Sequence, residues 1–144
     1  MKVFLIGAVH RAFHNGSKFD LCLTLKGPQG IGKSSFFKAL CPDSNWFTDT
    51  PIGKDKDNYL AVNSKWIIEL SELETVTTKK SAGEVKAFLS SPEDTYRKPY
   101  GRGLVTSKRP SVCCATVNKD EFLIDETGSR RFPVINCGDE QIDI

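Results

Sequence analysis

One stretch decides the fold, and it reads Gly27-Pro28-Gln29-Gly30-Ile31-Gly32-Lys33-Ser34. It is a complete G-x-x-x-x-G-K-S motif, the pattern of a phosphate-binding loop. An apolar run at residues 19–25 precedes it, and a helical run at residues 35–40 follows. In a strand–loop–helix unit the backbone N–H groups surround phosphate oxygens, and the helix N-terminus adds partial positive charge. The stretch therefore predicts binding of a nucleoside triphosphate, and a glycine-rich turn that matches by chance is the alternative.

Each residue type in this loop has a physical role. The glycines let the backbone come close to phosphates because they carry no Cβ. Lys33 can reach the β- and γ-phosphates, and the Ser34 hydroxyl can bind Mg²⁺. We expect the nucleotide to be held by Gly27, Pro28, Gln29, Gly30, Ile31, Gly32, Lys33, Ser34 and Ser35.

Length and composition indicate a small globular protein. The 144 residues carry a formal net charge of +2, so any basic surface must be local. We expect one domain over residues 1–144, with no membrane span because no long apolar stretch occurs. Five cysteines without C-x-x-C spacing favour a reducing cytoplasm, with Cys22, Cys113 and Cys114 as small buried hydrophobes.

Strand-like and helix-like segments alternate along the chain. Short apolar runs predict strands at residues 21–25, 46–49, 65–72, 111–116 and 131–135. Helical patterns occupy residues 3–13, 35–40 and 81–89, and Asp57 could cap a further short helix running to Val62. This order predicts an α/β fold, a three-layer P-loop NTPase with a mainly parallel central sheet and its ligand at the strand carboxyl ends.

The apolar run at residues 66–72 ends in two acids, Glu69 and Glu72. An NTPase needs a carboxylate beside the phosphate loop to hold Mg²⁺ or to orient the attacking water. Glu72 is the better candidate for the catalytic acid and metal ligand, because it falls just past the strand. Glu69 lies deeper, and burying it costs free energy unless it meets metal, water or a cation. The alternative is a pair of surface glutamates at the start of a helix.

Two further elements are weaker by themselves. Asn118 follows an apolar strand and could touch the γ-phosphate or the attacking water, although Asn-Lys-Asp is also a good turn sequence. Arg130 and Arg131 follow Gly128 and could supply an arginine finger to a neighbouring subunit. Taken alone, each of the two elements is better explained by its alternative, a turn asparagine for Asn118 and a solvated basic turn for the two arginines.

Residues 97–110 are basic, contain Pro and Gly, and suit an exposed hairpin or loop, and basic and aromatic side chains are interleaved over residues 96–109. Such a segment can neutralise phosphates and stack on unpaired bases. The alternative is a loop whose tyrosines, Tyr96 and Tyr100, pack back onto the domain. The predicted DNA contacts are Arg97, Lys98, Tyr100, Arg102, Lys108 and Arg109.

Together these elements resemble the virulence-associated protein E family of phages and mobile elements, which is related to superfamily 3 helicases. The resemblance covers nearly the whole chain and rests on the segments 7–12, 27–34, 46–49, 56–57, 66–73, 86–89, 96–102 and 127–132. It implies an AAA+-like ATPase core in which Asn118 is the first sensor and Arg130 or Arg131 is the finger. It also implies that the basic segment is a hairpin that contacts DNA in the channel of a ring. Family members usually continue on both sides of this region, so the resemblance leads us to expect a domain that is shorter than usual at both ends.

The function expected from the motifs and the resemblance is an ATPase, with ATP and Mg²⁺ as cofactors. It would act on single-stranded DNA in replication of a phage or mobile element, as a homo-oligomeric ring beside other replication proteins of that element. Two alternatives remain open: a nucleotide-binding accessory module with reduced catalysis, and a small-molecule P-loop kinase. The predicted catalytic residues are Lys33, Glu69, Glu72, Asn118, Arg130 and Arg131.

Overall fold

The computed structural model describes residues 1–51, 60, 62–71, 73, 79–98, 100–118 and 129–138. Its centre is a five-stranded sheet in which every paired neighbour runs parallel, in the order β2-β3-β6-β1-β7. The strands are β1 (Cys22–Lys26), β2 (Phe47–Pro51), β3 (Ile67–Ser71), β6 (Val112–Val117) and β7 (Val134–Asn136). The predicted α/β fold with a mainly parallel sheet is therefore confirmed.

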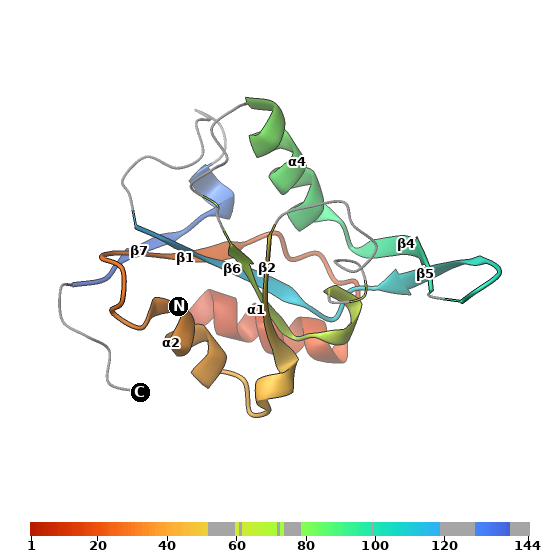
Figure 1. Ribbon diagram of the computed structural model, residues 1–144, viewed down its shortest axis with the longest axis horizontal. Coiled ribbons are helices and arrows are strands. Elements are labelled where there is room, and N and C mark those ends of the chain that lie inside the picture. The colour runs from red at the N-terminus through yellow and green to blue at the C-terminus, as the bar shows by residue number, and fades with distance from the viewer. Residues whose placement is uncertain are drawn as a thin grey trace.

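Helices cover both faces of this sheet (Figure 1). One face carries α1 (Lys2–Phe13) and α2 (Lys33–Ala39), whose Phe4, Ala8 and Phe37 are buried against the sheet. The other face carries α4 (Lys79–Ser90), whose Ala82, Val85 and Leu89 are buried. Two short 3-10 helices, η1 (Ser44–Trp46) and η3 (Ser129–Arg131), precede β2 and β7. The arrangement has three layers, as the sequence predicts.

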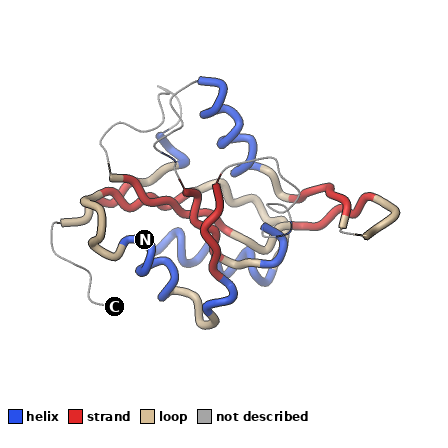
Figure 2. Tube along the Cα trace, viewed as in Figure 1, coloured by secondary structure: helices blue, strands red, loops and turns tan. Residues whose placement is uncertain are grey.

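A two-stranded antiparallel hairpin, β4 (Glu93–Arg97) and β5 (Leu104–Lys108), projects from one end of the molecule (Figure 2). Since β6 starts shortly after β5, the hairpin lies at the end of the sheet where β6 begins. The prediction of a hairpin between residues 97 and 110 is confirmed, although its first strand begins earlier, at Glu93.

The other predicted elements occur with shifted ends. The last strand is shorter than predicted, because Arg131 belongs to η3 and the strand begins at Val134. The predicted helix cap at Asp57 lies outside the described residues.

The three cysteines predicted to be buried lie inside the two apolar cores. Cys22 and Cys113 face the α4 side of the sheet, and Cys114 faces the α1 and α2 side. Burial raises the pKa of the Cys113 thiol to about 11, so this thiol stays protonated at neutral pH. All five cysteines are free thiols. Among the described residues, no helix is long and apolar enough to cross a membrane.

Candidate nucleotide-binding site

The glycine-rich loop connects the carboxyl end of β1 to α2. Gly30 and Gly32 have φ angles of 85° and 87°, a left-handed backbone that other residues rarely adopt. Gly32 is also the N-cap of α2. Beside the loop is a cavity of about 350 Å³, lined by Gln29, Gly30, Gly32, Lys33, Ser34, Ser35, Thr116 and Asn118. The sequence motif therefore borders a cavity at the carboxyl ends of β1 and β6, where a parallel sheet binds its ligands.

Lys33 is folded into the loop rather than facing solvent, because it is only 6% exposed. Its Nζ donates hydrogen bonds to the carbonyl oxygens of Gly27 and Pro28, at 2.7 and 2.6 Å, and to Asn118 Oδ1 at 2.9 Å. An ammonium group has three N–H donors, so these acceptors use its full capacity. A phosphate that binds Lys33 would have to take over at least one of these bonds.

Glu69, the deeper of the two acids, reaches this site. It is 4% exposed, and its Oε1 accepts hydrogen bonds from Ser34 Oγ at 2.8 Å and Thr116 Oγ1 at 2.5 Å. Its Oε2 is buried and has no hydrogen-bond partner among the described residues. The free energy cost of burying Glu69 is thus offset at one oxygen only.

This donor set fits a magnesium ion. Ser34 and Glu69 offer hydroxyl and carboxylate oxygens, the ligands that Mg²⁺ prefers. The unpartnered Oε2 is a buried oxygen with capacity for a cation or a metal-bound water. Glu72, predicted as metal ligand and catalytic acid, lies outside the described residues, and both roles stay predictions for it.

Asn118 and the two arginines occupy different surroundings. Asn118, just past β6, lines the cavity and accepts the bond from Lys33. Arg130 is exposed, whereas Arg131 is half-buried and forms an ion pair with Asp20, with 2.9 Å between Nε and Oδ2. The structure therefore brings Lys33, Ser34, Glu69 and Asn118 together, and Arg130 and Arg131 do not line this cavity.

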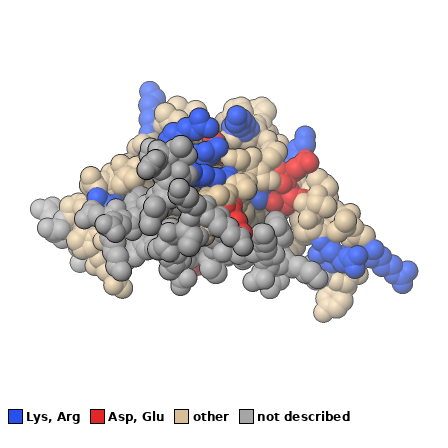
Figure 3. Space-filling model, turned by 90° about the horizontal axis from the view of Figure 1, so that it is seen from above, with Lys and Arg blue, Asp and Glu red and all other residues tan. Residues whose placement is uncertain are grey.

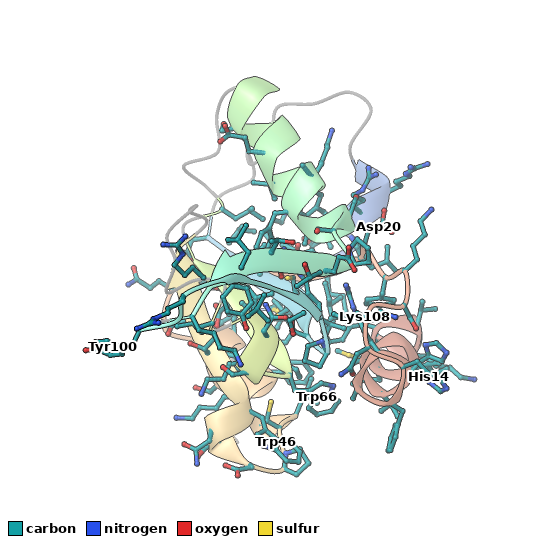
Figure 4. The ribbon with its side chains drawn as sticks, turned by 90° about the vertical axis from the view of Figure 1, so that its right-hand side faces the viewer. His14, Asp20, Trp46, Trp66, Tyr100 and Lys108 are labelled. Atoms are coloured by element: carbon teal, nitrogen blue, oxygen red, sulfur yellow. The ribbon has the colours of Figure 1, made fainter. Side chains whose placement is uncertain are left out.

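The hairpin carries most of the predicted DNA contacts on its surface. Lysine and arginine side chains gather at its projecting end, on the right of Figure 3. Tyr100 is fully exposed, at 107% of its reference area, and points away from the body of the protein in Figure 4. Tyr96, in contrast, is 8% exposed and packs inward. The two tyrosines thus divide between the alternatives that the sequence left open. The exposed members of the predicted set are Arg97, Lys98, Tyr100, Arg102 and Lys108.

Arg109 is not a surface residue, and its predicted contact with DNA is wrong. It is 3% exposed, and its Nη2 and Nε lie 2.5 Å from the two carboxylate oxygens of Asp94. Its Nη1 donates to the Phe88 carbonyl, and the guanidinium stacks 4.4 Å above the Phe88 ring. With three of its N–H groups bonded and one face against Phe88, the buried Arg109 anchors the base of the hairpin to the end of α4 and has no access to a phosphate.

Arg11 reinforces the same anchor from the opposite layer. From α1 it donates to the carbonyl oxygens of Arg109, Ser91 and Phe19. Both ends of the hairpin are therefore tied to the body of the protein. The sequence shows Arg11, Asp94 and Arg109 as ordinary charged residues, and no spacing pattern marks them as one buried cluster.

Thr116 is the site residue that the sequence does not single out. Register explains its position. Glu69 pairs with Cys114 between β3 and β6, so Thr116, two residues further on, shares the Glu69 face of the sheet. A polar residue two positions before Asn118 in an apolar strand is the signal that could identify it.

The family model for the virulence-associated protein E-like domain matches residues 1–144. The chain belongs to this family. The resemblance inferred from the motifs is therefore confirmed over the whole chain. No curated protein matches the sequence.

Two similar solved structures are both described as apo A forms of the NrS-1 C-terminal region. The first, residues 305–718, has a TM-score of 0.63 and 17% sequence identity over 94% of this chain. The second has a TM-score of 0.56 and 18% identity over 82% of this chain. The chain spans 32% and 29% of the length of these structures. At these identities the likeness shows a shared fold.

Proposed function

We propose that this domain is an AAA+-like P-loop ATPase that binds ATP with Mg²⁺ and hydrolyses it. The observation that carries the proposal is the 2.8 Å hydrogen bond from Ser34 Oγ to the buried Glu69 carboxylate, directly beside the glycine-rich loop. A chance glycine turn has no reason to place its serine against a buried acid from another strand. An NTPase requires this pairing to hold Mg²⁺ at the phosphates.

The chain supplies each part of the chemistry from a different element. The loop N–H groups and Lys33 bind the phosphates, and Lys33 exchanges its loop carbonyls for phosphate oxygens. Ser34 and Glu69 would hold Mg²⁺, which would supply positive charge beside the phosphates. Asn118 lines the same cavity and would contact the γ-phosphate or the attacking water. Glu72 is proposed as the acid that orients this water.

The proposed nucleic-acid partner is single-stranded DNA, bound by the hairpin tip. Arg97, Lys98 and Arg102 are exposed there and can neutralise phosphates, and Tyr100 can stack on a base. Lys108 is exposed at the base of the hairpin, opposite Glu93, and is a further proposed phosphate contact. Family membership and the likeness to NrS-1 support a role in replication of a phage or mobile element.

We further propose that the domain works as a homo-oligomeric ring with a finger from Arg130. Arg130 is exposed, whereas Arg131 is paired with Asp20 in its own chain. Mixing Arg130→Ala and Lys33→Ala proteins should restore part of the hydrolysis, because each variant supplies the part that the other lacks. A rate per subunit that is independent of concentration, with a monomeric mass, would contradict the ring.

Phosphate release measured with and without single-stranded DNA tests the proposed function. We expect Mg²⁺-dependent hydrolysis of ATP that increases when DNA is added. Nucleotide binding without hydrolysis under any condition would instead support an accessory module. Phosphate transfer only in the presence of a small-molecule acceptor would support a kinase.

A further inference from the structure

Thr116 lies where β6 meets both Glu69 and the cavity. Its Oγ1 donates a 2.5 Å hydrogen bond to Glu69 Oε1, and its side chain lines the cavity beside Asn118. Within the part of the chain that the structure describes, Glu69 Oε1 accepts hydrogen bonds from two hydroxyl groups, those of Ser34 and Thr116. The orientation of this carboxylate therefore depends on Ser34 and Thr116.

The hydroxyl groups of Ser34 and Thr116 use their hydrogen for Glu69 and keep their lone pairs for other partners. A hydroxyl has one hydrogen to donate and two lone pairs to offer. Ser34 and Thr116 both direct their hydrogen to Glu69 Oε1, so both keep oxygen lone pairs for other partners. A serine that ligates Mg²⁺ needs this arrangement, because its hydrogen must point away from the ion.

A single bond from Ser34 would leave the carboxylate free to turn about its own axis. The second bond comes from a different element, the rigid central strand β6, and fixes the plane of the carboxylate. Fixing that plane keeps Oε1 in front of Ser34.

We propose that Thr116 is a positioning residue that holds the Glu69 carboxylate against Ser34, so that Ser34 presents its lone pairs to Mg²⁺. This inference rests on the proposed function, because it needs nucleotide and Mg²⁺ at the same site. Thr116 does not ligate the ion and acts through Glu69.

The test is a Mg²⁺ titration of nucleotide affinity, measured with a fluorescent ADP analogue in the complete chain. In Thr116→Val the hydroxyl is replaced by a methyl group of similar size. We expect unchanged affinity in EDTA, and a Mg²⁺ concentration for half-maximal tightening that is raised about tenfold, as for other partners that orient a metal ligand. Thr116→Ala also lacks the donor and should give the same shift, which covers the case in which the valine variant fails to fold.

Two controls separate positioning from packing. Thr116→Ser keeps the hydroxyl and should restore the wild-type Mg²⁺ midpoint. Thr24→Val makes the same chemical change on β1, where Thr24 Oγ1 donates to the Cys22 carbonyl, and should leave the midpoint unchanged. A serine variant as impaired as the valine variant would show that the methyl group matters and would overturn the inference.

The outcomes also distinguish this inference from the proposed function. Wild-type protein that binds no nucleotide, with or without Mg²⁺, overturns both. Wild-type binding that Mg²⁺ tightens, with the same midpoint in Thr116→Val and Thr116→Ala, overturns the role of Thr116 alone.

Discussion

The two ends of the central sheet use their charged residues in opposite ways. At the carboxyl ends, Lys33 and Glu69 are buried, and each bonds to the glycine-rich loop or to its serine. At the other end the hairpin tip exposes Arg97 and Lys98 to solvent, whereas its base buries the pair of Arg109 and Asp94. This difference between the two ends shows that a charged side chain is not a binding residue merely because it is charged. The buried Arg109 ties the hairpin to the body of the protein through Asp94 and the Phe88 carbonyl, whereas the buried Glu69 keeps one oxygen, Oε2, without a hydrogen-bond partner among the described residues.

Strand β6 joins these two ends. It follows the hairpin base at Arg109 and ends beside the cavity at Thr116 and Asn118. Six strand residues span about 20 Å, so a bound DNA strand and a bound nucleotide would be separated by roughly the length of one strand. We therefore expect substitutions at the cavity to change the rate of ATP hydrolysis. Substitutions at the hairpin base should change the free energy of unfolding, and substitutions at the tip should change the affinity for DNA.

The largest effect is expected from Lys33→Ala. Removing the positive charge at the phosphates should lower the rate of ATP hydrolysis by about 10²–10³-fold or more. Lys38→Ala, an exposed lysine on the same helix, is the matched control and should hydrolyse ATP normally. Because Lys33 is buried, circular dichroism melting must accompany the assay. An unchanged turnover in a folded Lys33→Ala protein would show that ATP is not hydrolysed at this cavity.

Arg109→Ala should break the hairpin base. It leaves Asp94 as a buried carboxylate without its cation, which typically lowers the free energy of unfolding by about 3–5 kcal/mol. Urea unfolding measures this change. Lys98→Ala at the tip should alter the free energy of unfolding by less than about 0.5 kcal/mol. Equal stability of the two variants would mean that base and tip do not differ as described.

The smallest effect is expected at the tip. Lys98→Ala should weaken binding of single-stranded DNA of every sequence and lower the salt slope by roughly 0.7, the value for one phosphate contact. Fluorescence anisotropy across a salt series measures both quantities.

Tyr100→Ala should weaken binding of single-stranded DNA by about 1–3 kcal/mol without changing the salt slope, because stacking releases no counterions. Absence of wild-type DNA binding at low salt, with a non-hydrolysable nucleotide present, would contradict the tip as a DNA-binding surface.

The sequence predicts the layers and the loop well, because both follow from local patterns. Alternating apolar runs mark the strands, and the G-x-x-x-x-G-K-S motif marks the turn between β1 and α2. Sequence patterns do not predict contacts between residues that lie far apart along the chain. Arg109 and Asp94 are 15 residues apart, Thr116 and Glu69 are 47 apart, and only the folded sheet brings each pair together. A basic run therefore predicts six DNA contacts although one of them is an interior ion pair.

The same limit governs the choice between the two acids. Position in the strand favours Glu72 as metal ligand, because an acid past the strand end costs less to bury. The structure places Glu69 against Ser34. Glu69 pairs with Cys114 of β6, so its side chain lies on the face of the sheet that α2 covers. Glu69 is thus the acid beside the loop serine, and the catalytic role of Glu72 stays a prediction.

The central claim is that Ser34 and Glu69 form the magnesium site of an ATP-binding loop. Calorimetric titration with a non-hydrolysable ATP analogue, with and without Mg²⁺, tests it in wild type, Glu69→Gln and Glu72→Gln proteins. We predict that Mg²⁺ tightens binding in wild type and in Glu72→Gln, and that this tightening is lost in Glu69→Gln while binding in EDTA persists. Tightening by Mg²⁺ that survives in Glu69→Gln, or a wild-type protein that binds no nucleotide, would contradict the account.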